Sequence, residues 1–309
     1  MVSKYSGEVQ AQFSNAIMDA LRRYDAGESP PHPAYHFTTL AGMKGILSTR
    51  SIWVTLATAS KDPSEITYAL SRAVRLLSLR RSASDPSFCA EVMALLDPAR
   101  SALVSDLGWK VYLACFRTNT NGSGHWKAYG DSGKGAALVF AMRPLVLPGM
   151  LFLPVIYDPE RQDRVIEEFI DSVALPIQCL SQNCPADEAH TMRKLSIGLT
   201  ALGIWTLAPL MKAPRFSDEQ EWRLIIVDAE NAAMRHAENL SKETFHRQAD
   251  GRDIPFKAVS YSALPLLGIE LGLHAPIDVN DPGLAKLAND ASPEIEVRIS
   301  RSRVTPGGS

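Results

Sequence analysis

Three short segments of the sequence combine polar, aromatic and acidic side chains in patterns that could support chemistry. They are residues 35–39 (YHFTT), 125–133 (HWKAYGDSG) and 216–223 (FSDEQEWR). The rest of the sequence lacks the HExxH and GxSxG motifs, an EF-hand loop and a glycine loop of the phosphate-cradling kind. The seven histidines are also scattered. We therefore expect no metal site and no ATP-dependent reaction.

The acidic segment carries the most reactive side chains. Alternate side chains of an extended segment share a face, so Glu219, Glu221 and Arg223 are expected on one face and Gln220 on the other. An arginine beside a carboxylate favours the ionised form. That state suits binding a hydroxyl or stabilising a developing positive charge. The alternative interpretation is a solvated strand entry that is closed by a salt bridge.

The other two segments could supply contacts to a ligand. In a strand over 35–38, His36 and Thr38 would share one face and line a cleft while the two aromatic residues point into the core. Trp126 and Tyr129 lie three residues apart, so on a helical turn they would form an aromatic wall for a flat ring. The alternatives are a core-edge histidine bonded to backbone and ordinary helix–sheet packing.

Short strands and grouped helices must position these segments. Hydrophobic patterns predict strands over 35–38, 51–55, 109–116, 134–140, 151–157 and 221–227, with weaker candidates at 254–261, 266–271 and 294–300. Helices are predicted after Thr39, from Asp62-Pro63 and Asp85-Pro86, and over 160–180 and 187–208. This order is not a regular alternation of strand and helix. It predicts an α+β fold with small mixed or antiparallel sheets and large helical insertions.

The same patterns predict three parts along the chain. Residues 1–33 are expected to form a helix and a proline-rich connector. Residues 34–272 are expected to form the α+β domain, with helical insertions at 60–108 and 158–210. Residues 273–309 would add an edge strand and a disordered tail.

Composition restricts the setting. The 309 residues carry a net charge of −2, so a nucleic-acid coat or a membrane-surface protein has no simple electrostatic basis. Four cysteines without a CxxC pair, and no apolar leader, predict a cytoplasmic protein. The uncharged run between Lys194 and Lys212 is predicted to be a buried helix of a soluble domain rather than a membrane span. An apolar helix over 187–211 could instead form a homodimer face.

The order of these segments resembles DUF2971, a bacterial family of unknown function. The resemblance covers about residues 34–272 and rests on Tyr35-His36-Phe37-Thr38, Ile52-Trp53-Val54-Thr55, Asp62-Pro63-Ser64-Glu65, Cys115-Phe116, Trp126-Lys127-Ala128-Tyr129-Gly130-Asp131 and Glu219-Gln220-Glu221-Trp222-Arg223. One departure is Lys61, where family members often carry Asn before the Asp-Pro pair.

The layout is also similar to that of ADP-ribosyltransferases, which cleave NAD at its nicotinamide bond. This resemblance implies that Glu221, Glu219 and His36 are the catalytic residues. It also implies that His36 contacts the ribose or diphosphate and that Trp126 or Tyr129 stacks on nicotinamide. Thr38 and Arg223 would complete the NAD contacts. The substrate would be NAD and the acceptor a protein or nucleic acid. Such a protein could serve as a toxin, an effector or a phage-defence enzyme. A clear middle strand residue of that pattern is missing.

Two other functions stay open. The chain could be a non-catalytic interaction or antitoxin-like module of the same fold, with Glu221 locked to Arg223. It could instead act on a nucleotide or nucleic acid. The basis for the latter is a set of arginines on predicted helix faces, namely Arg22, Arg23, Arg72, Arg75, Arg80 and Arg81.

Overall fold

The structure is a computed structural model of the full chain. It describes residues 20, 31–59, 64–80, 85–97, 109–141, 150–183, 185–229, 240–249, 251–260 and 265–307. The predicted N-terminal helix, except for Ala20, and the predicted helix start at Asp62-Pro63 lie outside these ranges.

The described elements follow the order expected for an α+β chain. The strands are β1 (Ala34–Thr38), β2 (Ser51–Leu56), β3 (Trp109–Arg117), β4 (Ala136–Phe140), β5 (Met150–Pro154), β6 (Glu221–Ala229), β7 (Phe245–Ala249), β8 (Arg252–Ser260), β9 (Leu266–Leu271) and β10 (Arg298–Arg301). The helices are α2 (Leu40–Thr49), α3 (Ser64–Arg80), α4 (Pro86–Leu95), α6 (Ser123–Ala128), α7 (Pro159–Asn183), α8 (Ala186–Leu207) and α9 (Pro282–Ala291). A 3₁₀ helix, η5 (Pro214–Glu219), leads into β6.

Local capping explains where several helices begin. The Thr39 side chain accepts a hydrogen bond from the Gly42 amide and starts α2. Asp85 accepts from the amides of Ser87 and Phe88, and Pro86 occupies the first turn of α4. Both starts confirm the sequence-based predictions.

The strands form one mixed sheet rather than the small separate sheets that the sequence predicts. Across the described strands the order is β10-β9-β4-β1-β3-β2-β8-β7, with β6 beside β3 and β5 beside β6. The β9–β10 pair is parallel, and the other pairs are antiparallel. Hydrogen bonds between strands that are far apart in the sequence join these strands into one sheet. Local sequence patterns do not contain this pairing.

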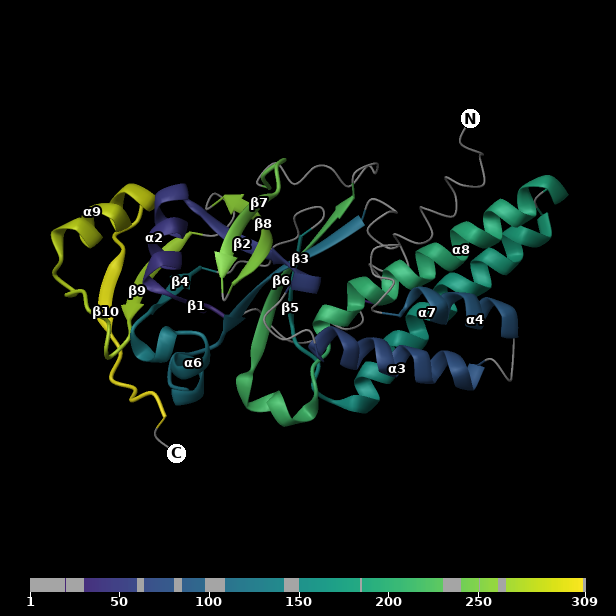
Figure 1. Cartoon of the computed structure of the whole chain (residues 1–309), viewed down its shortest axis with the longest axis horizontal. Helices are drawn as coiled ribbons and strands as arrows, with labels where there is room; N and C mark the ends of the chain where they lie inside the picture. Colours follow the sequence, from purple (N-terminus) through teal and green to yellow (C-terminus); the bar gives the residue numbers. More distant parts are fainter. Residues whose placement is uncertain are drawn as a thin grey trace.

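Strand β3 is the point where the sheet divides. One edge of β3 pairs with β6 from Trp109↔Ala229 to Arg117↔Glu221. The opposite edge is shared, because β1 meets it at Arg117 and β2 meets it at Tyr112 and Leu113. Figure 1 shows the consequence: β1, β4, β9 and β10 lie to one side, while β2, β7 and β8 form a separate wing.

Helices α3, α4, α7 and α8 pack together at one end of the molecule (Figure 1, right). Their apolar faces form a continuous core that includes Leu77, Val92 and Phe169. Gly203 of α8 lies so close to the Phe169 ring that an added Cβ would be 1.9 Å from it. The two predicted helical insertions therefore cover each other's apolar surface. Among the described helices, none has both the length and the apolar character needed to span a bilayer.

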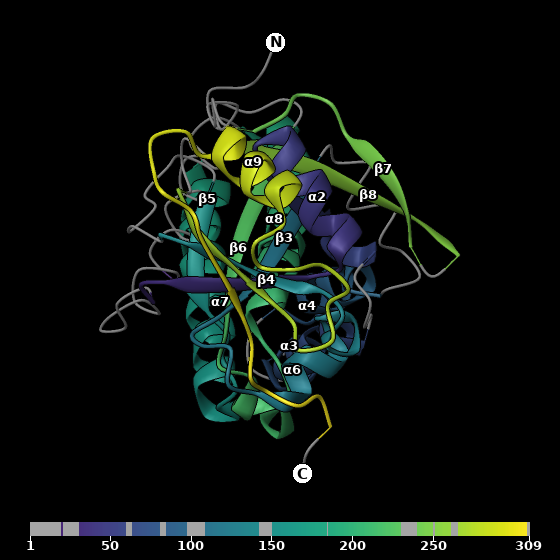
Figure 2. The same ribbon diagram turned by 90° about the vertical axis from the view of Figure 1, so that its left-hand side faces the viewer.

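A second core lies between the sheet and the helices α2 and α9, which cover it together in Figure 2. The final strand is shorter than the sequence predicts, because β10 begins at Arg298 instead of residue 294. Residues up to 307 are described, and the Pro306 ring lies against Gly133. The tail is thus placed as far as residue 307, and residues 308–309 lie outside the described part.

Candidate functional site

The acidic segment belongs to a group of five charged side chains where β3 and β6 end. We call this group the ionic cluster; it consists of Arg117, Lys212, Glu219, Glu221 and Arg223. Glu221 faces Arg117 across the β3–β6 ladder, and η5 brings Glu219 to the same place. Three cations therefore meet two carboxylates at one end of the sheet.

Glu221 is bound on both carboxylate oxygens. Arg223 Nε donates to Oε1 at 2.6 Å, and Lys212 Nζ lies 3.3 Å from Oε2. The side chains of these three residues are each 2% exposed. Burial by itself would raise the pKa of Glu221, but the surrounding cations outweigh it and hold that pKa far below its usual range. Glu221 is an ionised, shielded carboxylate.

Glu219 lies closer to the surface. Its side chain is 18% exposed, and its Oε2 atom is 2.5 Å from Lys212 Nζ and 3.0 Å from Arg117 Nη2. The sequence predicts that the two glutamates flank Gln220 in an extended segment, and the structure shows that this prediction is wrong. Gln220 has the left-handed conformation, with φ 42° and ψ 49°, because the chain turns there from η5 into β6.

Two tyrosines complete the surroundings of the ionic cluster. The Tyr129 ring lies 5.3 Å from the Arg117 guanidinium, and the residue is 38% exposed. The Glu221 amide donates to Tyr157 Oη at 3.1 Å. Burial raises the pKa of Tyr129 to about 12, so its hydroxyl remains protonated at neutral pH. Tyr129 and Glu219 are thus the parts of this site that a ligand could reach.

Trp126 does not share the exposure of Tyr129. Helix α6 ends at Ala128 and Tyr129 is its C-cap residue, with φ −121°, so the Tyr129 backbone departs from the helical conformation that the sequence predicts. The Trp126 ring is 0% exposed, packs against Phe37, and donates from Nε1 to the Thr120 carbonyl at 2.9 Å. As placed, Trp126 is a core residue and its ring is closed to a nicotinamide.

His36 lies on the opposite face of the sheet from the ionic cluster. Tyr35 is paired with Arg117, which is paired with Glu221, so these three side chains share a face and His36 points the other way. The His36 ring instead packs on Phe116 at 5.5 Å, and its Nδ1 bonds the Cys115 carbonyl at 2.9 Å. Thr38, two residues on in β1, is on the His36 face. The cleft expected between His36 and Glu221 is not formed.

The structure therefore brings together Glu219, Glu221, Arg223 and Tyr129, and separates them from His36, Thr38 and Trp126. Sequence reasoning missed Arg117, Lys212 and Tyr157. The sequence does single out the first two, because each is a cation that directly follows a long apolar run and so requires a partner if it is buried. In the described part of the chain, no group of three or more His, Cys, Asp and Glu side chains could hold a metal ion.

These features define an α+β protein with a buried ionic cluster at a branch of its sheet. Residues 125–224 match a family model described as "Protein of unknown function (DUF2971)". The matched part includes Tyr129, Lys212 and both glutamates of the ionic cluster but none of β1 or β2. No curated protein and no solved structure matches the chain.

Proposed function

We propose that this chain is a non-catalytic binding module in which the ionic cluster maintains the fold. The observation that carries this proposal is the state of Glu221, which is 2% exposed and has both oxygens bound to cations. A carboxylate that assists glycosidic cleavage must face the sugar and leave its charge uncompensated until positive charge develops there. Glu221 meets neither condition.

The net charge of the ionic cluster supports the same conclusion. Two carboxylates are matched by three cations, so an oxocarbenium-like centre next to this cluster would meet excess positive charge. The Arg223 guanidinium also donates to the Pro209 carbonyl at 2.6 Å. This links β6 to the chain just after α8, so the cluster joins the sheet to the helices.

A second candidate is the NAD-consuming transferase or glycohydrolase that the sequence suggests. It is favoured by the exposure of Glu219 beside the half-open Tyr129 ring. In that reaction the bond between ribose C1′ and the nicotinamide nitrogen breaks, and nicotinamide leaves with the bonding electrons. Water or an acceptor hydroxyl then forms the new C1′–O bond and loses a proton. Glu219, rather than Glu221, would be the carboxylate next to the sugar.

The alternative that the chain acts on nucleic acid is weakened, because three of the arginines that suggested it form ion pairs within the chain. Arg72 and Arg75 both pair with Asp163 of α7. Arg80 pairs with Asp171 of the same helix. These arginines of α3 are thus engaged within the helical lobe rather than forming a free basic face. Arg22, Arg23 and Arg81 lie outside the described residues.

Incubation of the full chain with NAD, with chromatographic detection of free nicotinamide, separates the two candidates. A non-catalytic module predicts no release above a protein-free blank, and no labelled acceptor in a cell lysate. Glu219→Gln is the informative variant, because this carboxylate is partly exposed and its loss leaves Glu221 in place. Glu294→Gln, at an exposed position, is the matched control.

Nicotinamide release that Glu219→Gln abolishes and Glu294→Gln preserves would overturn the non-catalytic proposal. Both variants must keep the far-ultraviolet circular dichroism spectrum and thermal transition of the parent chain. Release that survives Glu219→Gln would also overturn the non-catalytic proposal, and it would contradict the role given to Glu219 in the second candidate.

A further inference from the structure

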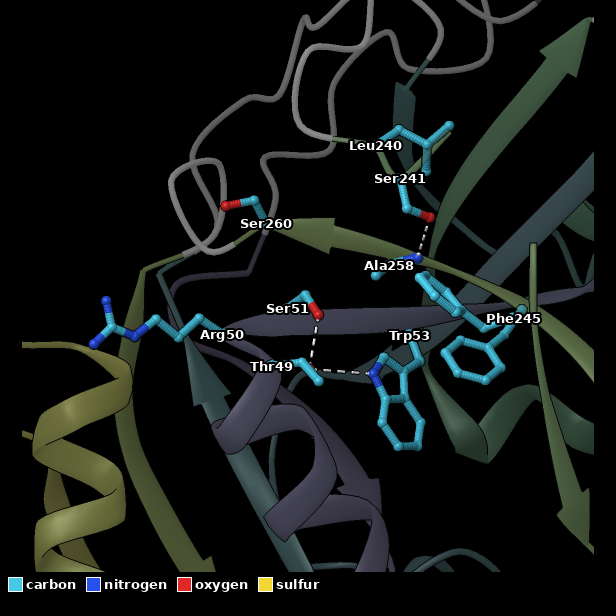
Figure 3. Close-up of a pocket in the computed structure, with 10 residues that line it drawn as sticks. Thr49, Arg50, Ser51, Trp53, Leu240, Ser241, Phe245, Ala258 and Ser260 are labelled. Carbon is cyan, nitrogen blue, oxygen red and sulfur yellow. Dashed lines mark hydrogen bonds between the residues drawn. The ribbon is translucent and has the colours of Figure 1, made fainter. Parts of the chain in front are cut away.

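A pocket on the β2–β8–β7 wing is lined by three aromatic rings, of which Phe245 is exposed, Trp53 half-buried and Phe256 buried. It has a volume of about 490 Å³, within the range of roughly 300–1,000 Å³ typical of small-molecule sites. Residues from the end of α2, from β2, β8 and β7, and from the segment before β7 line it. Figure 3 shows the Trp53 and Phe245 side chains among the residues that line this pocket.

Three aromatic rings form a continuous surface at this pocket, which we call the aromatic shelf: Trp53, Phe245 and Phe256. The Trp53 and Phe256 rings are 4.7 Å apart and inclined by 32°. Phe245 and Phe256 are 5.6 Å apart and inclined by 34°. The rings are therefore closer to parallel than to perpendicular. Phe245 is 41% exposed, which leaves an apolar ring open to a flat partner.

Arg247 borders the aromatic shelf and lacks an anionic partner. It lies two residues after Phe245 in β7 and so shares its face of the strand. Its Nη2 atom donates to Thr55 Oγ1 at 3.3 Å, and Thr55 in turn lies two residues after Trp53. The buried Nε of Arg247 has no hydrogen-bond partner. Within the described part of the chain, no carboxylate pairs with this guanidinium.

An uncompensated, partly buried guanidinium is costly unless an anion binds to it. Arginine presents a planar set of N–H donors that fits phosphate oxygens. Burial lowers the pKa of Arg247, which reflects the same lack of a counter-charge. Burial is the main cause that lowers the pKa of the His36 imidazole, and the positive charge of Arg247 lowers it further. The uncompensated positive charge of Arg247 therefore favours the binding of an anion at this part of the wing.

Arg50 is the arginine among the residues that line the pocket, whereas Arg247 lies beside the aromatic shelf, outside that lining. Arg50 lines the opposite end, is exposed, and points away from Trp53 and Phe245 in Figure 3. Arg247 is therefore the better anchor for an anionic group whose attached ring lies on the shelf.

We propose that the aromatic shelf and Arg247 form a binding site for a nucleoside monophosphate, with the base stacked on the shelf and the phosphate held by Arg247. This site is separate from the ionic cluster, and the inference holds whether or not the chain cleaves NAD. Stacking on the exposed Phe245 ring tolerates any base, whereas a single arginine next to the shelf fits one phosphate group.

The test is isothermal titration calorimetry of the full chain with adenosine monophosphate and with adenosine. The monophosphate is expected to bind more tightly, because only it engages Arg247. Arg247→Gln should weaken monophosphate binding by about tenfold or more and leave adenosine binding unchanged. Phe245→Ala should weaken both ligands by about fivefold to a hundredfold, as expected for the loss of a stacking ring.

His246→Gln is the matched control. It lies between Phe245 and Arg247 on the opposite face of β7, where it contacts Asp253, and it should change neither affinity. Variants are compared only if they keep the cooperative thermal transition of the parent. If either variant fails this condition, Arg247→Lys or Phe245→Leu replaces it.

Three results would overturn the proposal. The first is no binding of the monophosphate at millimolar concentration. The second is an Arg247→Gln variant that weakens adenosine and its monophosphate equally. The third is a single-stranded hexanucleotide that binds over tenfold more tightly than the monophosphate through the same residues, because that result would assign the site to nucleic acid.

Discussion

The ionic cluster and the Arg247 surface both contain arginine, but they differ in what surrounds the guanidinium. Arg223 is 2% exposed, bonds the Glu221 carboxylate, and donates to the Pro209 carbonyl. Arg247 bonds one neutral hydroxyl and keeps a buried Nε without a partner. A charge compensated within the chain stabilises the fold, whereas a charge left uncompensated beside a pocket indicates an external partner. Chemistry-bearing residue types alone do not distinguish these two situations.

The largest expected effect is on the compensated side of this comparison. Glu221→Gln should lower the free energy of unfolding by about 3–5 kcal/mol, because it leaves buried cations without their counter-charge. Urea denaturation followed by circular dichroism measures the change. The exposed Glu294→Gln should fall within about 0.5 kcal/mol of the parent. A loss below about 1 kcal/mol for Glu221→Gln would show that the cluster does not stabilise the fold.

The pH dependence of stability tests the buried state of His36. Burial lowers the pKa of His36 to about 4 from its ordinary value of 6.5, so below pH 6.5 the unfolded chain takes up a proton that the native imidazole does not. The contribution of His36 to the free energy of unfolding is therefore complete above about pH 6.5. It falls between pH 6.5 and 4, by at most about 3 kcal/mol. His36→Gln, which can still donate to the Cys115 carbonyl, should flatten this slope. An unchanged slope in His36→Gln would assign it to other groups.

A double-mutant cycle sharpens the role of the Glu221–Arg223 pair. Glu221→Gln and Arg223→Met remove the two partners separately and together. Since the second change removes a cation that the first leaves unpaired, the double variant should lose less stability than the sum of the single losses. The expected coupling is about 0.5–3 kcal/mol, read from unfolding free energies. Additive losses would mean that each side chain acts through separate contacts.

The smallest effect is expected on the uncompensated side. Arg247→Met should change the free energy of unfolding by less than about 0.5 kcal/mol, because no ion pair is lost and the aliphatic part of the side chain is replaced. The same urea titration measures it. A destabilisation above about 2 kcal/mol would show that Arg247 is a structural residue and would remove the contrast with Arg223.

Local sequence patterns were sufficient where an element depends on its own residues. The Thr39 and Asp85 caps and the apolar run of β3 follow directly from propensity and capping chemistry. Strand β7 was not predicted, because FHRQA has two apolar residues among polar ones and reads as surface. Its pairing with β8 is a tertiary effect that overrides this weak local preference.

The candidate site shows the same limit. The Glu221–Arg223 ion pair was foreseeable from spacing, since the two residues lie two apart in one strand. The contacts with Arg117 and Lys212 were not, because they depend on the β3–β6 pairing and on the left-handed turn at Gln220. The separation of His36 from Glu221 depends on the same register, which sequence spacing does not contain.

The β3–β6 ladder also has a consequence for the order of events during translation. β3 ends at Arg117 and its partner begins at Glu221, so about a hundred residues must be synthesised before the ladder can close, which takes roughly 5–20 s at about 5–20 residues per second. Helices α3 and α4 are synthesised before β3, whereas α7 and α8, which later cover them, are synthesised during this interval. The nascent chain thus carries an open sheet edge and two uncovered helices on the ribosome until the second half of the protein arrives.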